Sequence, residues 1–313
     1  MKKTKKGCDL SIIIVNFNTK EITRECVESI IEKTSGLNYE IIVIDNASSD
    51  GSVQTLKDLT KSLSNLRLIL NKDNLGFGKG NNQGFKIAKG EFILLLNTDT
   101  KILDNVLCEM VIWMRNHPKV GVSSCALKNK DGSVQGTGGY FPHLTKVFAW
   151  MFFLEDLPIL DKLIKPFHPM HGQSPFYKGE GLFKIELERD WLTGAFFLMR
   201  RKVYEQVGLI DKDYFMYTEE VDYCYRVKKL GWKVWYLPRW KIIHYGGASS
   251  TREFPILSEY KGIKTFYRKH KPQWQTPFLR LFLKMGAFIR IFLFGALKGK
   301  EAAVTYVKAF SEA

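Results

Sequence analysis

Acidic side chains in two distant parts of the chain have types and spacings that suit chemistry at a divalent cation. The apolar run LLL is followed directly by NTDT at 97–100, so that Asp99 stands among small polar neighbours. Mg²⁺ is held in proteins by one or two carboxylates together with substrate phosphates, which makes a single aspartate at a strand end sufficient. An Asx turn without a ligand is the alternative for Asp99.

The second acidic group follows the aromatic segment YFMY and consists of Glu219, Glu220 and Asp222. Surroundings of low polarity raise the pKa of a carboxyl group and favour general-base catalysis. The alternative is that the three acids only complement the dipole of the helix that they begin. His244 closes a short apolar stretch before a Gly-Gly pair, and its neutral imidazole could be a second ligand to the cation, although a lone His is more often structural.

Apolar periodicity predicts the elements that position these residues. Continuous β-branched or aliphatic runs at 10–17, 40–45, 66–70 and 92–96 are typical of strands covered on both faces. Helical patterns alternate with them, the first after a capping box of Asn18 and Glu21, and the others near 51–64, 79–89 and 103–116. This alternation predicts a doubly wound α/β sheet that binds its ligand at the carboxyl edge, where the polar loops gather.

The second half of the chain has a different pattern. RDWLTGAFFLMRR reads as one strand, 219–232 as a helix closed by Gly231, and KVWYLP and KIIHYGG as two short strands. The glycines at 76, 78, 80 and 84 match neither G-x-G-x-x-G nor a Walker A motif. A flexible loop is one interpretation, but the interspersed Asn74, Asn81 and Asn82 favour an approach to a polar ligand. Asp45 ends a buried strand and could accept from a base N–H or a ribose hydroxyl.

Composition limits the class of protein. The 313 residues are 45% hydrophobic, which is enough for a sizeable core, and five cysteines without a CxxC pair argue against a disulfide framework and for a reducing compartment. The basic N-terminal head precedes an apolar stretch too short for a signal peptide, so a first core strand is expected there. Formal net charge is +15, and 261–300 holds ten basic residues and no acidic one, which predicts an anionic partner for that region.

The motifs SIIIVNFN, IIVIDNASSDGS, NLGFGKGNNQG, LLLNTDT, WLTGAFFLMRR and EEVDYCYRVKKLGWKVWYLP…IIHYGG occur in this order. Together they resemble family 2 glycosyltransferases, and most closely the rhamnosyltransferase-like branch that builds surface polysaccharides. The resemblance covers about residues 10–250 and is specific because six motifs agree. It implies a GT-A fold with a Rossmann-like mixed sheet, a nucleotide-diphosphate sugar donor, Mg²⁺ or Mn²⁺, and inversion at the anomeric carbon.

The resemblance also implies roles for individual residues. Asp99 is the expected metal-binding aspartate, with Asn97 in place of the first acid of the D-x-D-type motif, so the cation would depend on Asp99 and on His244. Glu220 corresponds to the catalytic base, with Asp222 as the alternative; about 200° of helical rotation separates the two, so both cannot face one sugar. Donor-binding residues are expected to be Val15, Asn16, Asp45, Asn74, Gly76, Asn81, Asn97 and Asp99. Acceptor-side residues are expected to be Trp191, Thr193, Gly194 and Glu219, although Trp191 could be simple core.

The C-terminal segment 276–300 is apolar but interrupted by Arg280, Lys284 and Arg290, which is unlike a spanning helix. An amphipathic helix lying on an anionic membrane surface fits its pattern, with 147–160 as a second contact. The alternative is a helix packed on the domain with a basic outer face. Nucleic acid is not expected as a partner, because an aliphatic stripe runs between the cations.

These observations predict a catalytic domain at 1–250 and a basic membrane-associating helical region at 251–313. The expected function is metal-dependent transfer of a sugar, with rhamnose from dTDP-rhamnose as the candidate donor. The expected acceptor is a lipid-linked or polysaccharide glycan in cell-surface glycan synthesis at the cytoplasmic face of the cell membrane. A non-catalytic scaffold or nucleotide-sugar-binding protein of the same fold is the alternative function.

Overall fold

The computed structural model describes residues 7–157, 164–168, 183–246 and 253–313. The basic N-terminal head and the last residues of the 147–160 segment lie outside these ranges. The strands are β1 (Leu10–Asn16), β2 (Tyr39–Asp45), β3 (Leu66–Leu70), β4 (Phe92–Leu96), β5 (Thr100–Ile102), β6 (Val120–Lys128), β7 (Gly138–Gly139), β8 (Leu187–Glu188), β9 (Trp191–Leu192), β10 (Phe196–Arg200) and β11 (Lys233–His244). The helices are α1 (Lys20–Lys33), α2 (Ser52–Ser62), α3 (Gly76–Ile87), α4 (Val106–Asn116), α5 (Leu144–Met151), η1 (Leu154–Asp156), α7 (Arg201–Val207), α8 (Glu219–Lys229), α9 (Glu253–His270), α10 (Gln275–Lys298) and α11 (Lys300–Glu312).

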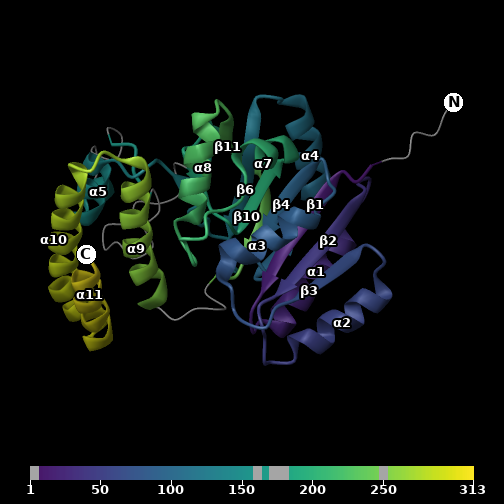
Figure 1. Cartoon of the computed structure of the whole chain (residues 1–313), viewed down its shortest axis with the longest axis horizontal. Helices are drawn as coiled ribbons and strands as arrows, with labels where there is room; N and C mark the ends of the chain where they lie inside the picture. The colour runs from purple at the N-terminus through teal and green to yellow at the C-terminus, as the bar shows by residue number, and fades with distance from the viewer. Residues whose placement is uncertain (1–6, 158–163, 169–182, 247–252) are drawn as a thin grey trace.

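The first half of the chain forms the parallel part of the main sheet, in the order β3-β2-β1-β4. Side chains of β1 alternate between two cores: Ile13 packs under α3, whereas Ile12 and Ile14 face α1 and α4. Because both faces are covered, these strands contain few polar residues before their carboxyl ends. The predicted alternation of strands and helices in this half is confirmed (Figure 1).

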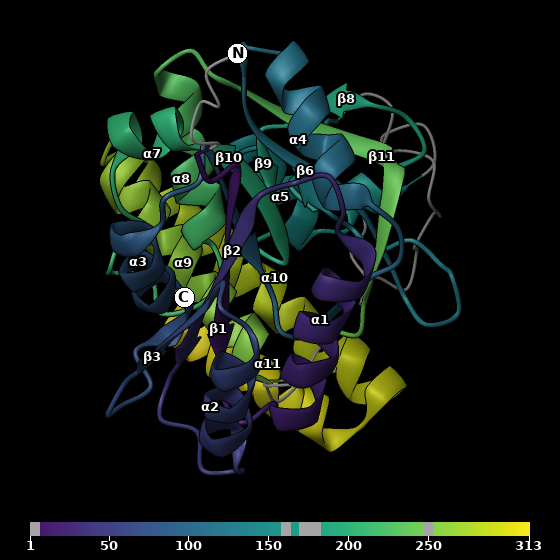
Figure 2. The same ribbon diagram turned by 90° about the vertical axis from the view of Figure 1, so that its right-hand side faces the viewer.

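The second half extends the sheet through β10, β6, β11 and β5 and makes it mixed. β10 runs antiparallel to β4 and β6, and β11 runs parallel to β6 but antiparallel to β5. Viewed from the side of α1 and α2, the C-terminal helices lie behind this sheet (Figure 2). The expectation of a Rossmann-like mixed sheet flanked by helices is therefore confirmed.

Several predicted boundaries are wrong. The expected single strand at 189–201 is two strands, β9 and β10, separated by a turn at 193–195. The two expected strands at 233–246 are one strand, β11, which continues through a register shift between Leu237 and Lys241 because an irregularity there absorbs the interruption. The predicted capping box is not formed either, since Asn18 has a positive φ of 52° and its Oδ1 accepts from the Ser49 N–H instead.

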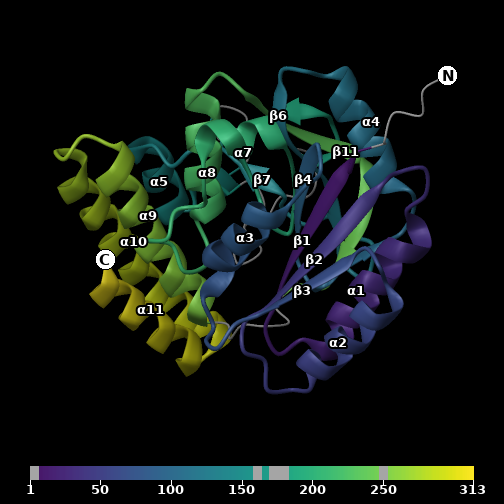
Figure 3. The same ribbon diagram turned by 45° about the vertical axis from the view of Figure 1, so that its right-hand side comes forward.

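Helices α9, α10 and α11 form a layer with α5 at one end of the molecule (Figure 3). Their apolar side chains, such as Phe266 and Leu283, belong to the same buried cluster as Phe197 of the sheet. No helix among the described residues is long and apolar enough to cross a membrane. The division at residue 250 stays a prediction, but the C-terminal helices share one core with the sheet that precedes them.

Arg290, one of the three cations that interrupt the apolar C-terminal segment, is buried. The side chain is 2% exposed, and its guanidinium donates to the Met151 and Trp150 carbonyl oxygens at 2.6 and 2.8 Å. Its Cζ also lies 4.2 Å from the centre of the Phe153 ring. Arg290 therefore joins α10 to the end of α5, because its guanidinium donates to two carbonyl groups in the last turn of that helix.

We expect Arg290→Ala to lower the free energy of unfolding by about 3 kcal/mol, since it leaves buried carbonyl oxygens unpaired and opens a void. Lys298→Ala, on the exposed end of the same helix, should change it by less than about 0.5 kcal/mol. Urea denaturation followed by circular dichroism measures both. Equal stability of the two variants would contradict the joining role of Arg290.

Candidate functional site

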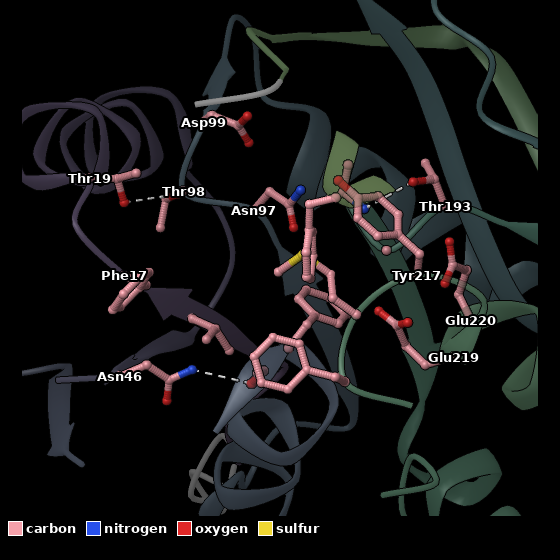
Figure 4. A pocket seen from close by; sticks show the side chains of 18 of the residues that line it. Phe17, Thr19, Asn46, Asn97, Thr98, Asp99, Thr193, Tyr217, Glu219 and Glu220 are labelled. Carbon is pink, nitrogen blue, oxygen red and sulfur yellow. Dashed lines mark hydrogen bonds between the residues drawn. The ribbon is translucent and has the colours of Figure 1, made fainter. Parts of the chain in front are cut away.

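A cavity of about 440 Å³ opens at the carboxyl edge of the sheet. Ten of the residues proposed from the sequence line it: Val15, Asn74, Gly76, Asn97, Asp99, Thr193, Gly194, Glu219, Glu220 and His244. Figure 4 shows Asp99 on one side of the cavity and the carboxylates of Glu219 and Glu220 on the other. The two acidic groups, which lie 120 positions apart in the sequence, thus share one space, as the topology predicted.

Strand pairing brings Asp99 and His244 together. Thr100, which begins β5, lies opposite His244 at the end of β11, and the Tyr245 N–H donates to the Asp99 carbonyl oxygen at 2.8 Å. The side chains then meet, with 3.2 Å between His244 Nε2 and Asp99 Oδ1. Both side chains are largely buried at the cavity wall.

Gln135 fixes the orientation of the His244 ring. Its Nε2 donates to Asn129 Oδ1 and to the His244 carbonyl, so its Oε1 faces His244 Nδ1 at 2.6 Å and must accept a hydrogen there. The lone pair of a neutral imidazole then points from Nε2 toward Asp99. Two acceptors would face each other, so a proton or a cation is needed between them.

The pair fits a divalent cation. Two ligands at about 2.1 Å from an ion and about 90° apart are roughly 3 Å from each other, close to the spacing of Nε2 and Oδ1. A nitrogen and an oxygen donor together favour Mn²⁺ over Mg²⁺, which takes oxygen ligands. Within the described ranges no group of three or more His, Cys, Asp or Glu side chains could hold a metal, so the remaining ligands would come from a substrate or water.

The opposite wall is the start of α8. Tyr217 and Thr218 both have positive φ, of 70° and 74°, a conformation that costs about 1 kcal/mol or more in a residue other than glycine. This turn directs the Tyr217 side chain into the cavity and positions Glu219 and Glu220 at the edge of the cavity (Figure 4). Close packing on α9 holds the turn, since a Cβ at Gly262 would lie 2.3 Å from Thr218 Oγ1.

Burial perturbs both carboxyl groups at this wall. It raises the pKa of Glu220 to about 7, against weaker lowering by a backbone hydrogen bond and by nearby His168. Burial and then the charge of Glu220 raise the pKa of Glu219 well above its ordinary value. One oxygen of each, Oε2, has no hydrogen-bond partner among the described residues. A pair of this kind holds a proton near neutral pH at the wall of the cavity, as a general acid or base requires.

Aromatic side chains close the cavity beside these acids. Phe254, at the start of α9, lies 6.2 Å from the Phe215 ring and 6.1 Å from the Tyr217 ring, measured between centroids. The Phe215 carbonyl reaches so close to α3 that a Cβ at Gly76 would lie 2.4 Å from it. Gly76 is therefore required at this approach, and its φ of +79° also favours glycine.

Amide side chains form the end of the cavity nearest β1 and β2. Asn46 Nδ2 donates to Asn74 Oδ1 and to the Gly76 carbonyl, each at 3.2 Å, and joins the end of β2 to the start of α3. Val15 and Asn74 line the space beside it. This end of the cavity offers amides and an aliphatic surface, which suit an uncharged heterocycle.

Five of the proposed site residues do not line the cavity. Asn16 donates to Asp45 Oδ2 at 2.6 Å, and both are at most 1% exposed, so they hold β1 and β2 together beneath the wall. Asn81 is buried and donates back to the Phe77 carbonyl. Trp191 packs in the core, with its ring 5.9 Å from that of Phe167, which agrees with the alternative interpretation of it as core.

Asp222 is the fifth. It is 1% exposed, and both of its oxygens are engaged by neighbouring side chains: one accepts from Arg226 Nε at 2.9 Å and the other faces His270 Nε2 at 2.6 Å. These bonds tie α8 to α9 rather than reach the cavity. Asp222 therefore fits a structural role, and the helical rotation between it and Glu220 is as expected.

Sequence reasoning missed several lining residues, among them Phe17, Thr19, Asn46, Phe215, Tyr217 and Phe254. Asn46 follows Asp45 at a strand end, so its position was a usable signal. Phe254 and Gln135 offered none, because their place depends on how α9 and the segment after β6 cross the sheet.

A family model described as "Glycosyl transferase family 2" matches residues 11–208. An N-acetylglucosaminyl-diphospho-decaprenol L-rhamnosyltransferase of Mycobacterium tuberculosis is 26% identical over 253 residues, which cover 76% of this chain and 77% of that protein. The rhamnosyltransferase WbbL of Escherichia coli is 24% identical over 241 residues, covering 75% of this chain and 82% of that protein.

Two solved structures have the same fold. The mannosyltransferase PcManGT from Pyrobaculum calidifontis, in complex with GDP-Man and Mn²⁺, aligns with a TM-score of 0.57 and 14% identity, covering 98% of this chain and 81% of that one. GalNAc-T7 with UDP, GalNAc and Mn²⁺ aligns with a TM-score of 0.61 and 15% identity. The alignment covers 96% of this chain and 55% of that one. These likenesses show the GT-A fold.

Gln135→Leu should weaken Mn²⁺ binding about 10- to 100-fold in the presence of a nucleoside diphosphate, because it releases the His244 ring from the orientation that aims Nε2 at Asp99. Electron paramagnetic resonance of free Mn²⁺ measures the affinity. Lys130→Gln, in the nearby turn, is the matched control and should not change it. Unchanged Mn²⁺ affinity in Gln135→Leu would remove His244 from the proposed ligands.

Proposed function

The chain belongs to glycosyl transferase family 2, whose members are inverting hexosyltransferases, and we propose that its cavity transfers a sugar from a nucleotide-diphosphate donor between Asp99 and Glu220. One observation carries this proposal: a carboxylate beside a histidine and a carboxyl group of raised pKa face each other across one cavity. We propose that this transfer belongs to cell-surface glycan synthesis, which the similarity to the two rhamnosyltransferases supports.

The donor's diphosphate would lie near Asp99 and His244. The described lining contains three carboxylates and no Lys or Arg, so a diphosphate would be repelled there without a bound cation. Mg²⁺ or Mn²⁺ held by Asp99 and His244 supplies Lewis-acid stabilisation of the departing diphosphate, which is worth several kcal/mol. Asn97 and Thr98 are small enough to let the diphosphate approach, and the nucleoside would extend toward Asn46, Asn74 and Val15.

Glu220 would accept the proton of the attacking hydroxyl. Glu220 lines the cavity, and its raised pKa suits a general base at neutral pH, whereas Glu219, whose pKa is also raised, keeps its proton and can donate to the sugar. The hydroxyl attacks the anomeric carbon from the face opposite the diphosphate, so the configuration inverts. Asp222 is not retained as an alternative base, because both of its oxygens are engaged by Arg226 and His270.

The acceptor would enter beside Thr193, Gly194 and the aromatic group of Phe215, Tyr217 and Phe254, since sugar faces stack on aromatic rings. We propose dTDP-rhamnose as the donor: rhamnose as the transferred sugar is supported by the names of two relatives, and a lipid-linked acceptor by the name of one. We propose accordingly that the enzyme acts as a peripheral protein on the cytoplasmic face of the cell membrane. Nucleic acid is not proposed as a partner.

Substitution of Glu220 and of Asp99 should distinguish the role of the base from the role of the metal ligand. Glu220→Gln should lower kcat at least about 100-fold with little change in donor affinity, because it removes only the proton acceptor. Asp99→Ala should weaken donor binding and remove its dependence on Mn²⁺. Donor hydrolysis and isothermal titration with and without EDTA measure these effects, and Glu205→Gln, on exposed α7, is the control.

Activity that survives both chelation and Asp99→Ala would refute the metal role. Donor binding without product across a broad panel of acceptors would favour the non-catalytic alternative.

The rate should also depend on the protonation of Glu220. A base must be deprotonated, so kcat/KM should rise with pH and level off above an apparent pKa near 7, the value to which burial raises this group. Glu220→Asp should move this limb to lower pH, because the ordinary pKa of an aspartate is lower than that of a glutamate. A rate independent of pH between about 5 and 8 would contradict the assignment.

A further inference from the structure

Helix α10 carries an apolar stripe that nothing in the described structure covers. It consists of Trp274, just before the helix, and of Phe278, Leu281, Met285, Phe288 and Phe292, with exposed fractions of 62, 49, 52, 42, 54 and 64%. At 3.6 residues per turn the six fall within about 80° of one face and extend for roughly 27 Å. Soluble proteins rarely expose a continuous apolar surface of this kind, so it marks an interaction site.

The stripe is distinct from the face by which α10 packs on the protein. Leu279, Leu283 and Phe294 are at most 1% exposed and join the core with α9 and α11. In Figures 1 and 3, α10 lies on the side of α9 away from the sheet. Phe148 of α5, 38% exposed and 5.1 Å from the Phe282 ring, extends the apolar surface sideways.

Cations border the stripe along the junction with α11. Lys284 Nζ lies 5.6 Å from the centre of the Phe310 ring, which is itself 38% exposed, and Arg280 Nε donates to the Ala313 carbonyl. Lys298 and Lys300 stand at the far end of the helix, both exposed. No ion pair to an acid is found in the described structure for Arg280, Lys284, Lys298 or Lys300.

We propose that this face, defined by Trp274, Phe278, Leu281, Met285, Phe288 and Phe292, docks on an anionic lipid bilayer. Apolar side chains would enter the headgroup and acyl boundary to about 5 to 10 Å, while the lysines remain at the level of the lipid phosphates. A second copy of the chain is less suitable, because facing stripes would bring two unpaired cationic borders together. The inference deepens the proposed function, on which it rests, by naming the surface that would bring the cavity to a lipid-linked acceptor.

The structure also decides which residues of the C-terminal segment can contact the lipid. Arg290, which interrupts the same apolar segment, is buried against α5 and cannot contribute. The apolar stripe is therefore the primary contact, and Lys284 and Lys298 add an electrostatic part of roughly fivefold each in affinity.

Vesicle sedimentation tests the proposal with the full chain. The wild-type protein should bind phosphatidylcholine vesicles containing phosphatidylglycerol, and bind pure phosphatidylcholine vesicles more weakly. Phe288→Ser with Phe292→Ser should lower the affinity for the anionic vesicles at least tenfold. The control is Ile112→Ser with Leu230→Ser, which removes two side chains that are 50 and 53% exposed on other elements and should bind as the wild type does.

Absence of wild-type binding to anionic vesicles, or equal loss in the control, would overturn the proposal. So would a wild-type dimer in sedimentation velocity that Phe288→Ser with Phe292→Ser converts to monomer without changing vesicle binding. Donor hydrolysis is measured on the same samples in the absence of lipid, and it should be equal in all of them. Loss of vesicle binding with hydrolysis intact separates failure of the docking face from failure of the proposed catalytic function.

Discussion

The contact between Asp99 and His244 is the interaction on which the site depends. It exists because β5 pairs with β11, so Asp99, the residue just before β5, lies beside His244, the last residue of β11. Gln135 then fixes the ring so that its nitrogen lone pair faces a carboxylate. Such an arrangement is unfavourable unless positive charge lies between the two groups, and a diphosphate placed next to it needs the same charge. A cation between Asp99 and His244 is therefore expected on three grounds. They are the strand pairing, the orientation of the His244 ring and the lack of basic side chains in the described lining of the cavity.

The opposite wall, at the start of α8, also contains groups that are unfavourable in the protein without a ligand. Glu219 and Glu220 are adjacent, poorly solvated and each short of one hydrogen bond, and they follow two residues in a left-handed conformation. None of this stabilises the fold. The core beneath α8, the close contact of Gly262 with Thr218, and the bonds of Asp222 to α8 and α9 hold the turn in place. Packing elsewhere therefore maintains a carboxyl group of raised pKa where a hydroxyl can reach it.

The parts of the fold that sequence could predict are those governed by local periodicity. The four parallel strands are continuous aliphatic runs, and each ends in polar residues that the sheet topology must bring to one edge, so Asp99, Asn97 and Asn74 could be placed at the cavity in advance. Asp45 and Asn16 end neighbouring strands too, but they satisfy each other, which is decided by a register that the sequence does not display. The places of Trp191 and Arg290 could not be predicted for a similar reason, because an aromatic or cationic residue in an apolar stretch has the same local pattern whether it faces a ligand, a membrane or backbone carbonyl groups. Phe254 and Gln135 reach the site only through long-range packing.

The most direct test of the central claim is the position of the metal itself. Crystals grown with Mn²⁺ and a nucleoside diphosphate, measured near the manganese absorption edge, should give an anomalous peak about 2.1 to 2.3 Å from Asp99 Oδ1 and His244 Nε2 and in contact with the diphosphate. A peak that contacts the diphosphate but neither of these side chains, or a diphosphate bound at this edge without any peak, would contradict the account.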